Sequence, residues 1–140
     1  MKTSEQLRQF EVYSRAELAE KFRITDMTLN TGIFQPAGHD SVWLFITEDK
    51  PADRTQYRDC LTGDELHWEG QTSGRKDALI INHRAKGLEL LVFYRKFKNE
   101  HDNCAFRCEG PFEYVSHERT QPAAFRLRRV KSSNQQRTTR

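Results

Sequence analysis

Apolar residues in the first part of the chain recur at the spacing of a helix. In SRAELAEKF (residues 14–22), Leu18, Ala19 and Phe22 fall on one face. Ser14 is followed three residues later by Glu17, which is the pattern of a capping box at a helix N-terminus. We therefore predict a helix over residues 14–22.

The next stretch, ITDMTLN (residues 24–30), has the periodicity of a second short helix, which Thr25 or Asp26 would cap and Gly32 would end. The pair resembles a helix-turn-helix motif. However, Arg23 stands where that motif usually has a glycine, and no further helix of the required bundle follows. A helical pair packed on a sheet is the alternative.

From residue 33 onward the pattern changes to short runs of β-branched and aromatic residues, separated by Gly, Pro, Asn and Asp. In AAFRLRRV, Phe125 and Leu127 alternate with two arginines, as in a strand with one buried face. Weaker strand character occurs around residues 59–61 and 66–68. The runs that we predict as strands are 42–47, 78–82, 88–95, 104–107, 112–116 and 123–130.

A helical start followed by several strands predicts an α+β fold, with a curved β-sheet or small β-barrel and helices at its N-terminal end. We expect a single domain over residues 14–130, made of the helical pair (14–30) and a β-rich body (33–130). Residues 1–13 would form an N-terminal extension, and residues 131–140 a disordered basic tail.

The bulk composition favours one domain with its own core. The 140 residues suffice for this without disulfide bonds. No apolar run reaches the length of about 18 residues that a membrane helix needs, and the N-terminus lacks an apolar signal segment. We therefore expect a cytoplasmic protein without a membrane partner.

The net charge of +3 arises in the tail, from Lys131, Arg137 and Arg140. The rest of the chain is neutral but polarised, because acidic residues dominate 48–69 and basic residues dominate 75–98. This distribution suits a polyanionic partner, although ordinary solvated faces explain it equally well.

The sequence lacks the motifs of several classes of catalytic and metal-binding site. It contains no GxxxxGK[ST] loop, no GxGxxG fingerprint and no nuclease motif. Cys104 and Cys108 lie near His101, but their spacing lacks a second pair of metal ligands. We predict free cysteines, no metal, no cofactor and no catalytic activity. A small nucleotide-modifying enzyme that uses Cys60 or His67 remains an alternative.

The segment GDELHWEGQT (residues 63–72) places an imidazole and an indole side by side in what reads as a loop or strand end. A hydrophobic core accounts for Trp68 alone, and Trp43 in VWLFIT is expected to be a core residue. Together, His67, Trp68 and Gln71 suit a surface that receives a flat ligand.

An ordered series of segments resembles a domain of bacterial defence proteins. That domain occurs at the C-terminus of restriction enzymes built from a phospholipase-D-type nuclease and a helicase, and beside HNH endonucleases. The matching segments are LFITEDK (44–50), TQYRDCL (55–61), LHWEGQT (66–72), LLVFYRK (90–96) and FRCEGPFEYVSHERTQPAAFRLR (106–128).

The central motif of that family reads approximately Phe-His-Trp-x-Ser-Gln. His67, Trp68 and Gln71 match it, whereas Leu66 replaces the Phe and Gly70 the Ser. The later element from residue 110 to 122 also matches. The motifs do not fix which ligand each family member recognises.

The family is thought to resemble SET- and RING-associated (SRA) domains and their PUA-like relatives, which flip a modified cytosine into an aromatic cage. The resemblance therefore implies a PUA/SRA-like fold and a module that binds double-stranded DNA. It also implies that the module reads a methylated or hydroxymethylated cytosine and is linked to restriction or defence. Stacking on one aromatic face contributes about 1–3 kcal/mol, comparable to the cost of unstacking, so two aromatic faces are expected.

Tyr57 and Trp68 are the candidates for these two faces. Asp59 would accept a hydrogen bond from the N4 amine of cytosine, and Gln71 or His67 would bind the rest of its edge. Each has an ordinary structural alternative, such as a core position for Trp68 or a turn cap for Asp59.

The candidate phosphate contacts are Arg58, Arg75, Lys76 and Arg84. Because family members are usually fused to nucleases, a separately encoded nuclease is a candidate partner. Two other functions remain open: a helix-turn-helix transcription regulator that uses residues 15–30, and a protein-interaction adaptor without a nucleic-acid role.

Overall fold

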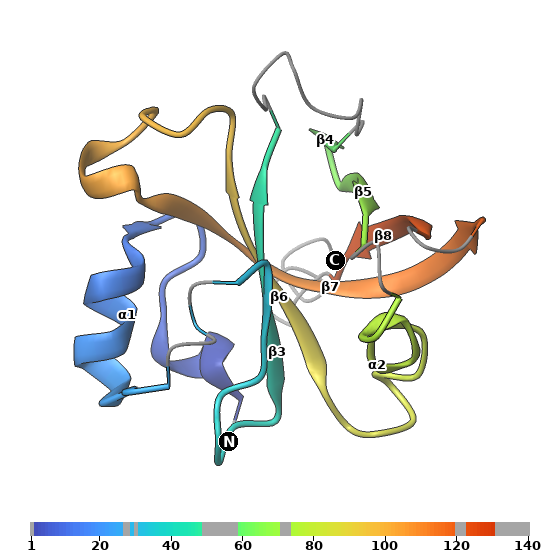
Figure 1. Ribbon diagram of the computed structural model, residues 1–140, viewed down its shortest axis with the longest axis horizontal. Coiled ribbons are helices and arrows are strands. Elements are labelled where there is room, and N and C mark those ends of the chain that lie inside the picture. The colour runs from blue at the N-terminus through green and yellow to red at the C-terminus, as the bar shows by residue number, and fades with distance from the viewer. Residues whose placement is uncertain are drawn as a thin grey trace, which may run out of the picture.

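The computed structural model describes residues 2–26, 29, 31–48, 59–70, 74–119 and 123–130. In these residues the chain forms an α+β fold with a curved, mixed sheet of eight strands (Figure 1), which confirms the predicted fold class. None of the helices found there is long and apolar enough to cross a membrane.

The elements follow one another as η1 (Thr3–Gln6), β1 (Val12–Tyr13), α1 (Arg15–Phe22), β2 (Ile33–Phe34), β3 (Ser41–Thr47), β4 (Cys60–Thr62), β5 (Glu65–Glu69), α2 (Asp77–Ile81), β6 (Glu89–Arg95), η3 (Asp102–Cys104), β7 (Phe106–Glu118) and β8 (Ala124–Arg129). The strand order is β2-β3-β6-β7-β8-β5-β4, and β1 pairs with β7. Strands β3 and β6 are parallel, and the other pairs are antiparallel.

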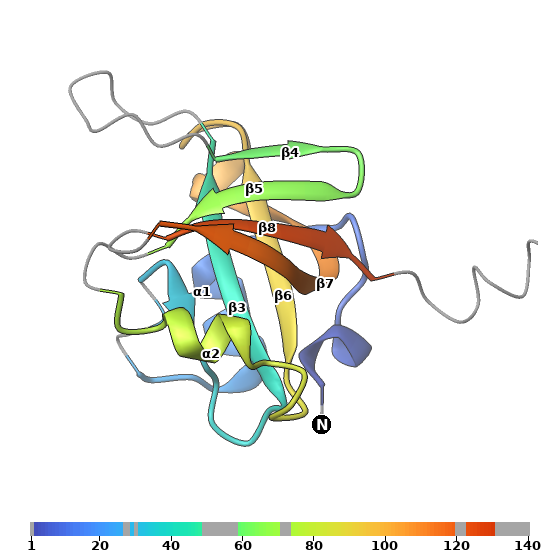
Figure 2. The ribbon, with the colours of Figure 1, turned by 90° about the vertical axis from the view of Figure 1, so that its right-hand side faces the viewer.

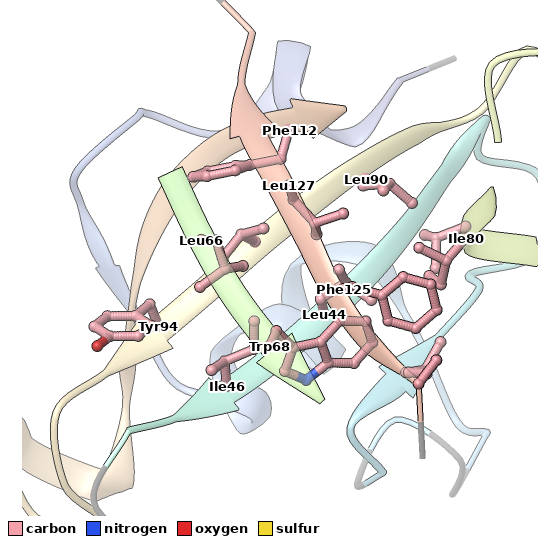
Figure 3. Packing of buried hydrophobic residues seen from close by; sticks show 14 residues of the cluster. Leu44, Ile46, Leu66, Trp68, Ile80, Leu90, Tyr94, Phe112, Phe125 and Leu127 are labelled. Carbon is pink, nitrogen blue, oxygen red and sulfur yellow. The ribbon is translucent and has the colours of Figure 1, made fainter. Parts of the chain in front are cut away.

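Both faces of β3 and β6 are buried, and their residues alternate between two hydrophobic clusters. From β3, Val42, Leu44 and Ile46 join a cluster with β5, β8 and α2 (Figure 3), whereas Trp43 and Phe45 join a cluster with α1. Figure 1 shows α1 and α2 on opposite sides of these strands. The apolar runs in the sequence thus correspond to strands that are covered on both sides.

Strand β7 curves the sheet over the first of these clusters. Its first part pairs with β6 and its second part with β8, and the register shifts between Val92 and Phe93 in one pair and between Tyr114 and Ser116 in the other. Such β-bulges bend a strand and increase its twist. As a result β8, β5 and β4 run across β3 and β6 (Figure 2), which places the end of β5 at the surface.

The predicted helix over residues 14–22 is confirmed as α1. Ser14 Oγ accepts from the backbone N–H of Glu17 at 3.0 Å, and the Ser14 N–H donates to the Glu17 carboxylate at 2.8 Å. Arg23 ends the helix in the left-handed conformation that a glycine usually adopts (φ 55°, ψ 48°). The predicted second helix is absent over residues 24–26, and Met27, Thr28 and Asn30 lie outside the described residues.

The strands predicted over residues 42–47, 88–95 and 123–130 are confirmed as β3, β6 and β8. The strand predicted over residues 78–82 is wrong, because this run forms the helix α2. A short run of four apolar residues fits either element, and here Asp77 begins a helical turn that buries Ile80 completely. The two strands predicted over 104–107 and 112–116 belong in large part to one strand, β7.

The segment before α1 is tied to the sheet. Trp43 is fully buried, as predicted, and its indole N–H donates to Thr3 Oγ1 at 3.0 Å. The buried carboxylate of Glu89 accepts from the hydroxyls of Ser4 and Ser41, each at 2.6 Å. The start of the predicted N-terminal extension therefore packs against β3 and β6, and Val12 and Tyr13 pair with β7.

Gly110 is a position in β7 where a side chain is expected to be costly. Its φ is +91°, and a Cβ there would collide with the side chain of Gln9, which donates to the Glu109 carbonyl at 2.9 Å. We expect Gly110→Ala to lower the free energy of unfolding by about 1–3 kcal/mol, measured by urea denaturation. Gly38→Ala is the control, because Gly38 has a φ of +81° with no atom near its Cβ. An equal loss in both variants would contradict a steric role for Gln9.

His83 joins the end of α2 to β7 and is expected to make stability depend on pH. Its Nδ1–H donates to the Leu88 carbonyl at 2.8 Å, and its Nε2 accepts from the Tyr114 N–H at 3.0 Å. Burial lowers the pKa of His83 from its ordinary value. The unfolded chain, with a histidine pKa of about 6.5, then binds protons more readily than the folded chain.

Stability should therefore fall as the pH drops from about 7 through the lowered pKa of His83. Thermal unfolding of the wild type and of His83→Leu at pH 7.5 and pH 5 measures this effect. His39, whose pKa is also lowered, chiefly by burial, remains in both proteins. The variant should lose less stability than the wild type between the two pH values. An equal loss in both proteins would exclude His83 as the titrating group.

Candidate functional site

The main candidate site is a pocket of about 440 Å³ at the C-terminal end of β5, beside the start of β8 and the end of β7. The sheet register places Trp68 opposite Phe125, and Phe125 opposite His117. All three side chains line the pocket. Small-molecule sites commonly span about 300–1,000 Å³, so the pocket has room for one flat ring system.

A row of rings forms one wall of this pocket. Trp68 stacks on Phe125, with ring centroids 5.5 Å apart and 23° between the planes, and the rings of Phe125 and His117 lie 5.8 Å apart. The hydroxyl of Tyr114 lies 2.7 Å from Nδ1 of His117. The row therefore ends in an exposed imidazole that a hydrogen bond holds in place.

Charges of both signs line the same pocket. Glu69 forms an ion pair with Arg119 at 2.7 Å. Glu118 and Arg126 also line the pocket, and in the described part of the chain neither has an ion-pair partner within 4.0 Å. They leave a carboxylate acceptor and a guanidinium donor for a ligand.

The structure brings two of the residues predicted to bind the base, His67 and Trp68, to the pocket and places Asp59 elsewhere. His67 is exposed and lines the pocket, and Trp68 lines it while being only 6% exposed. Asp59 is buried and accepts from the Glu69 N–H at 3.0 Å, an interaction that joins the two ends of the β4–β5 hairpin. Tyr57 and Gln71 lie outside the described residues.

The predicted phosphate contacts do not line the pocket where they are described. Arg84 forms an ion pair with Glu113 at 3.0 Å and donates to the Tyr114 carbonyl. Arg75 and Lys76 immediately precede α2, and Arg58 lies outside the described residues.

The alternative catalytic pair Cys60 and His67 are direct neighbours across the β4–β5 hairpin. Both side chains are exposed. Cys60 Sγ lies 3.5 Å from Thr62 Oγ1, and no hydrogen bond joins it to His67 within the described residues. The arrangement thus lacks the hydrogen bond by which a general base activates a thiol.

The other thiols show no reactive arrangement. Burial raises the pKa of Cys108 to about 11, which keeps it protonated at neutral pH. Cys104 lines a second hollow of about 490 Å³ between α1 and η3, together with Glu17 and Glu20. Across the described ranges, no three His, Cys, Asp or Glu side chains gather as metal ligands.

Of the residues that line the pocket, only His67 and Trp68 were predicted as site residues. The polar or charged residues that sequence reasoning missed include His117, Glu118, Arg119 and Arg126. The signal for the first three was the second family-like element, over residues 110–122, which carries them next to the Trp68 motif once β7 and β8 pair. Arg126 was recognised only as the polar position of a strand.

Comparison with models of known protein families finds no family that matches this chain. Comparison with curated proteins finds no match either.

Proposed function

We propose that the protein is a cytoplasmic DNA-binding module, without catalysis of its own, that recognises a methylated or hydroxymethylated cytosine. The flipped base would enter the pocket at the end of β5. The observation that carries this proposal is that one pocket combines an aromatic row with a carboxylate and a guanidinium that have no ion-pair partner among the described residues.

The chemistry of the pocket walls suits a cytosine. The exposed imidazole of His117 offers a ring against which a base can stack. The carboxylate of Glu118 can accept from the N4 amine, which distinguishes cytosine from thymine, because thymine has a carbonyl at that position. Ala124 and Phe125 offer apolar surface for a substituent at C5.

The outer face of the sheet beside the pocket suits the DNA backbone. The register places Arg126 between His67 and Ser116, on the exposed face of β8. A guanidinium in this position can hold a phosphate next to the flipped nucleotide. Arg119 also lines the pocket, and its guanidinium can donate to the DNA backbone once its ion pair with Glu69 opens.

The resemblance to domains of restriction proteins supports the same function, and it adds the proposal of a link to defence. In this reading the module would guide a separately encoded nuclease to modified DNA. The shared elements are His67 and Trp68 on β5 and the segment over residues 110–122, of which residues 116–119 line the same pocket.

The proposal predicts a measurable preference between duplexes. Fluorescence anisotropy would measure the affinity for three duplexes of the same sequence that carry cytosine, 5-methylcytosine or 5-hydroxymethylcytosine at one position, each at two salt concentrations. The wild type should bind a modified duplex most tightly. His117→Ala should weaken that binding by about 5- to 150-fold, the equivalent of about 1–3 kcal/mol of stacking.

Arg126→Gln should weaken binding to all three duplexes and reduce the salt dependence by about one phosphate contact. Lys21→Gln is the matched control, because Lys21 is exposed on α1, away from the pocket. Equal binding of all three duplexes, unaffected by His117→Ala, would refute the base pocket.

A further inference from the structure

The indole nitrogen of Trp68 is the single polar side-chain atom on a ring that is otherwise core. The side chain is only 6% exposed, and one face of the ring stacks on Phe125. So little of the ring reaches the surface that it cannot serve as a broad stacking platform. What this side chain offers a ligand is therefore its edge.

The N–H at this edge has no acceptor within the described residues. It is not sealed from solvent either, because every fully buried side-chain nitrogen and oxygen of those residues has a hydrogen-bond partner. Trp68 lines the pocket, and in Figure 3 the nitrogen is turned toward the C-terminal end of β5. A tryptophan buried to this extent usually donates to an acceptor.

Trp43, in contrast, is a buried tryptophan of the same fold whose indole N–H has a hydrogen-bond acceptor within the protein. Its ring is fully buried, and its N–H donates to Thr3 Oγ1 at 3.0 Å. The two tryptophans thus differ in one respect that bears on function: Trp43 has its acceptor within the protein, and Trp68 presents its donor at a pocket.

We propose that the Trp68 N–H donates a hydrogen bond to the acceptor edge, O2 or N3, of the flipped cytosine. This inference rests on the proposed function and assigns a specificity role to Trp68 in the same pocket. Cytosine carries these acceptors next to its N4 amine, so a donor from Trp68 and an acceptor from Glu118 match adjacent parts of one base edge.

The two indole N–H signals in a ¹H–¹⁵N spectrum test this directly, because the chain has two tryptophans. On addition of a duplex with 5-methylcytosine, the Trp68 signal should shift and its exchange with water should slow. The Trp43 signal should stay in place and exchange slowly with or without DNA.

Two variants provide a second readout. Trp68→Phe keeps an aromatic ring against Phe125 but removes the N–H, and it should bind the modified duplex about two- to tenfold more weakly. Trp43→Phe removes an N–H remote from the pocket and should bind as the wild type does.

The outcomes separate this inference from the proposed function. Saturating, modification-dependent binding with an unmoved Trp68 signal would overturn the inference and leave the function standing. Equal binding of all duplexes with a shifted Trp68 signal would overturn the preference for modified cytosine and leave the hydrogen bond standing. No binding to any duplex would overturn both.

Discussion

Trp68→Ala is expected to lower the free energy of unfolding by about 3–5 kcal/mol, as is typical for removing a large aromatic side chain from a core. The ring is 6% exposed, packs in the cluster that holds Leu66 and Leu127, and stacks on Phe125 (Figure 3). Its removal leaves a cavity that these neighbours fill only in part. Urea denaturation of the two proteins measures the loss.

His67→Ala is the matched control for this prediction. His67 is the preceding residue on β5 but points to the exposed face, so the change should alter stability by no more than about 0.5 kcal/mol. If Trp68→Ala left stability intact, Trp68 would be a surface residue of the pocket and its role in the core would be refuted.

The second large effect is expected at Glu109, which is 1% exposed and lies at the bulge of β7 between Cys108 and Gly110. Its carboxylate accepts from Arg107 at 2.6 Å and from Arg129 at 2.8 Å. Removing one partner of a buried ion pair leaves the other charge uncompensated, at a cost of about 3–5 kcal/mol.

We expect Glu109→Ala to cost about 3 kcal/mol, at the lower end of this range. Arg129 retains an ion pair with Asp64, and the Arg107 side chain is 46% exposed, so water compensates part of the loss. Thermal and urea unfolding would measure it.

Glu113→Ala provides the comparison within the same strand. Its ion pair with Arg84 joins side chains that are 31% and 62% exposed, and such pairs contribute about 0–1 kcal/mol. A loss in Glu109→Ala no larger than that in Glu113→Ala would show that the buried network does not stabilise the bend of β7.

Local sequence patterns predicted those helices and strands whose structure is determined by residues close together in the sequence. The capping box of Ser14 and Glu17 sets the start of α1, and the apolar runs of β3 and β6 are continuous because both faces are covered. The run over residues 78–82 was misread because short apolar runs carry no period that separates a strand from a helix. The burial of Ile80 against the sheet favours the helix over the strand for this run.

The course of β7 was harder to predict. Gly110 and Pro111 read as a break between two strands, yet the structure uses them inside one strand next to a bulge. A bulge depends on which residues of the neighbouring strand pair, and that information lies far away in the sequence.

Only part of the pocket stood out in the sequence, because its residues come from three strands that lie far apart along the chain. His67 and Trp68 stood out as neighbours in sequence, and both line the pocket. His117 and Arg126 reach it only through the pairing of β7, β8 and β5. Trp68 belongs to the hydrophobic core and also lines the pocket, but too little of its ring is exposed for it to form one of the two predicted stacking faces.

The central claim is that a modified cytosine leaves the duplex and enters the pocket beside His117. A duplex with 2-aminopurine next to a 5-methylcytosine tests it most directly, because 2-aminopurine fluoresces more strongly when its neighbour unstacks. We expect a rise in fluorescence on binding of the wild type and of Lys21→Gln. We expect little rise with His117→Ala or with unmodified cytosine. Tight binding of the methylated duplex without any rise would contradict base flipping and the pocket with it.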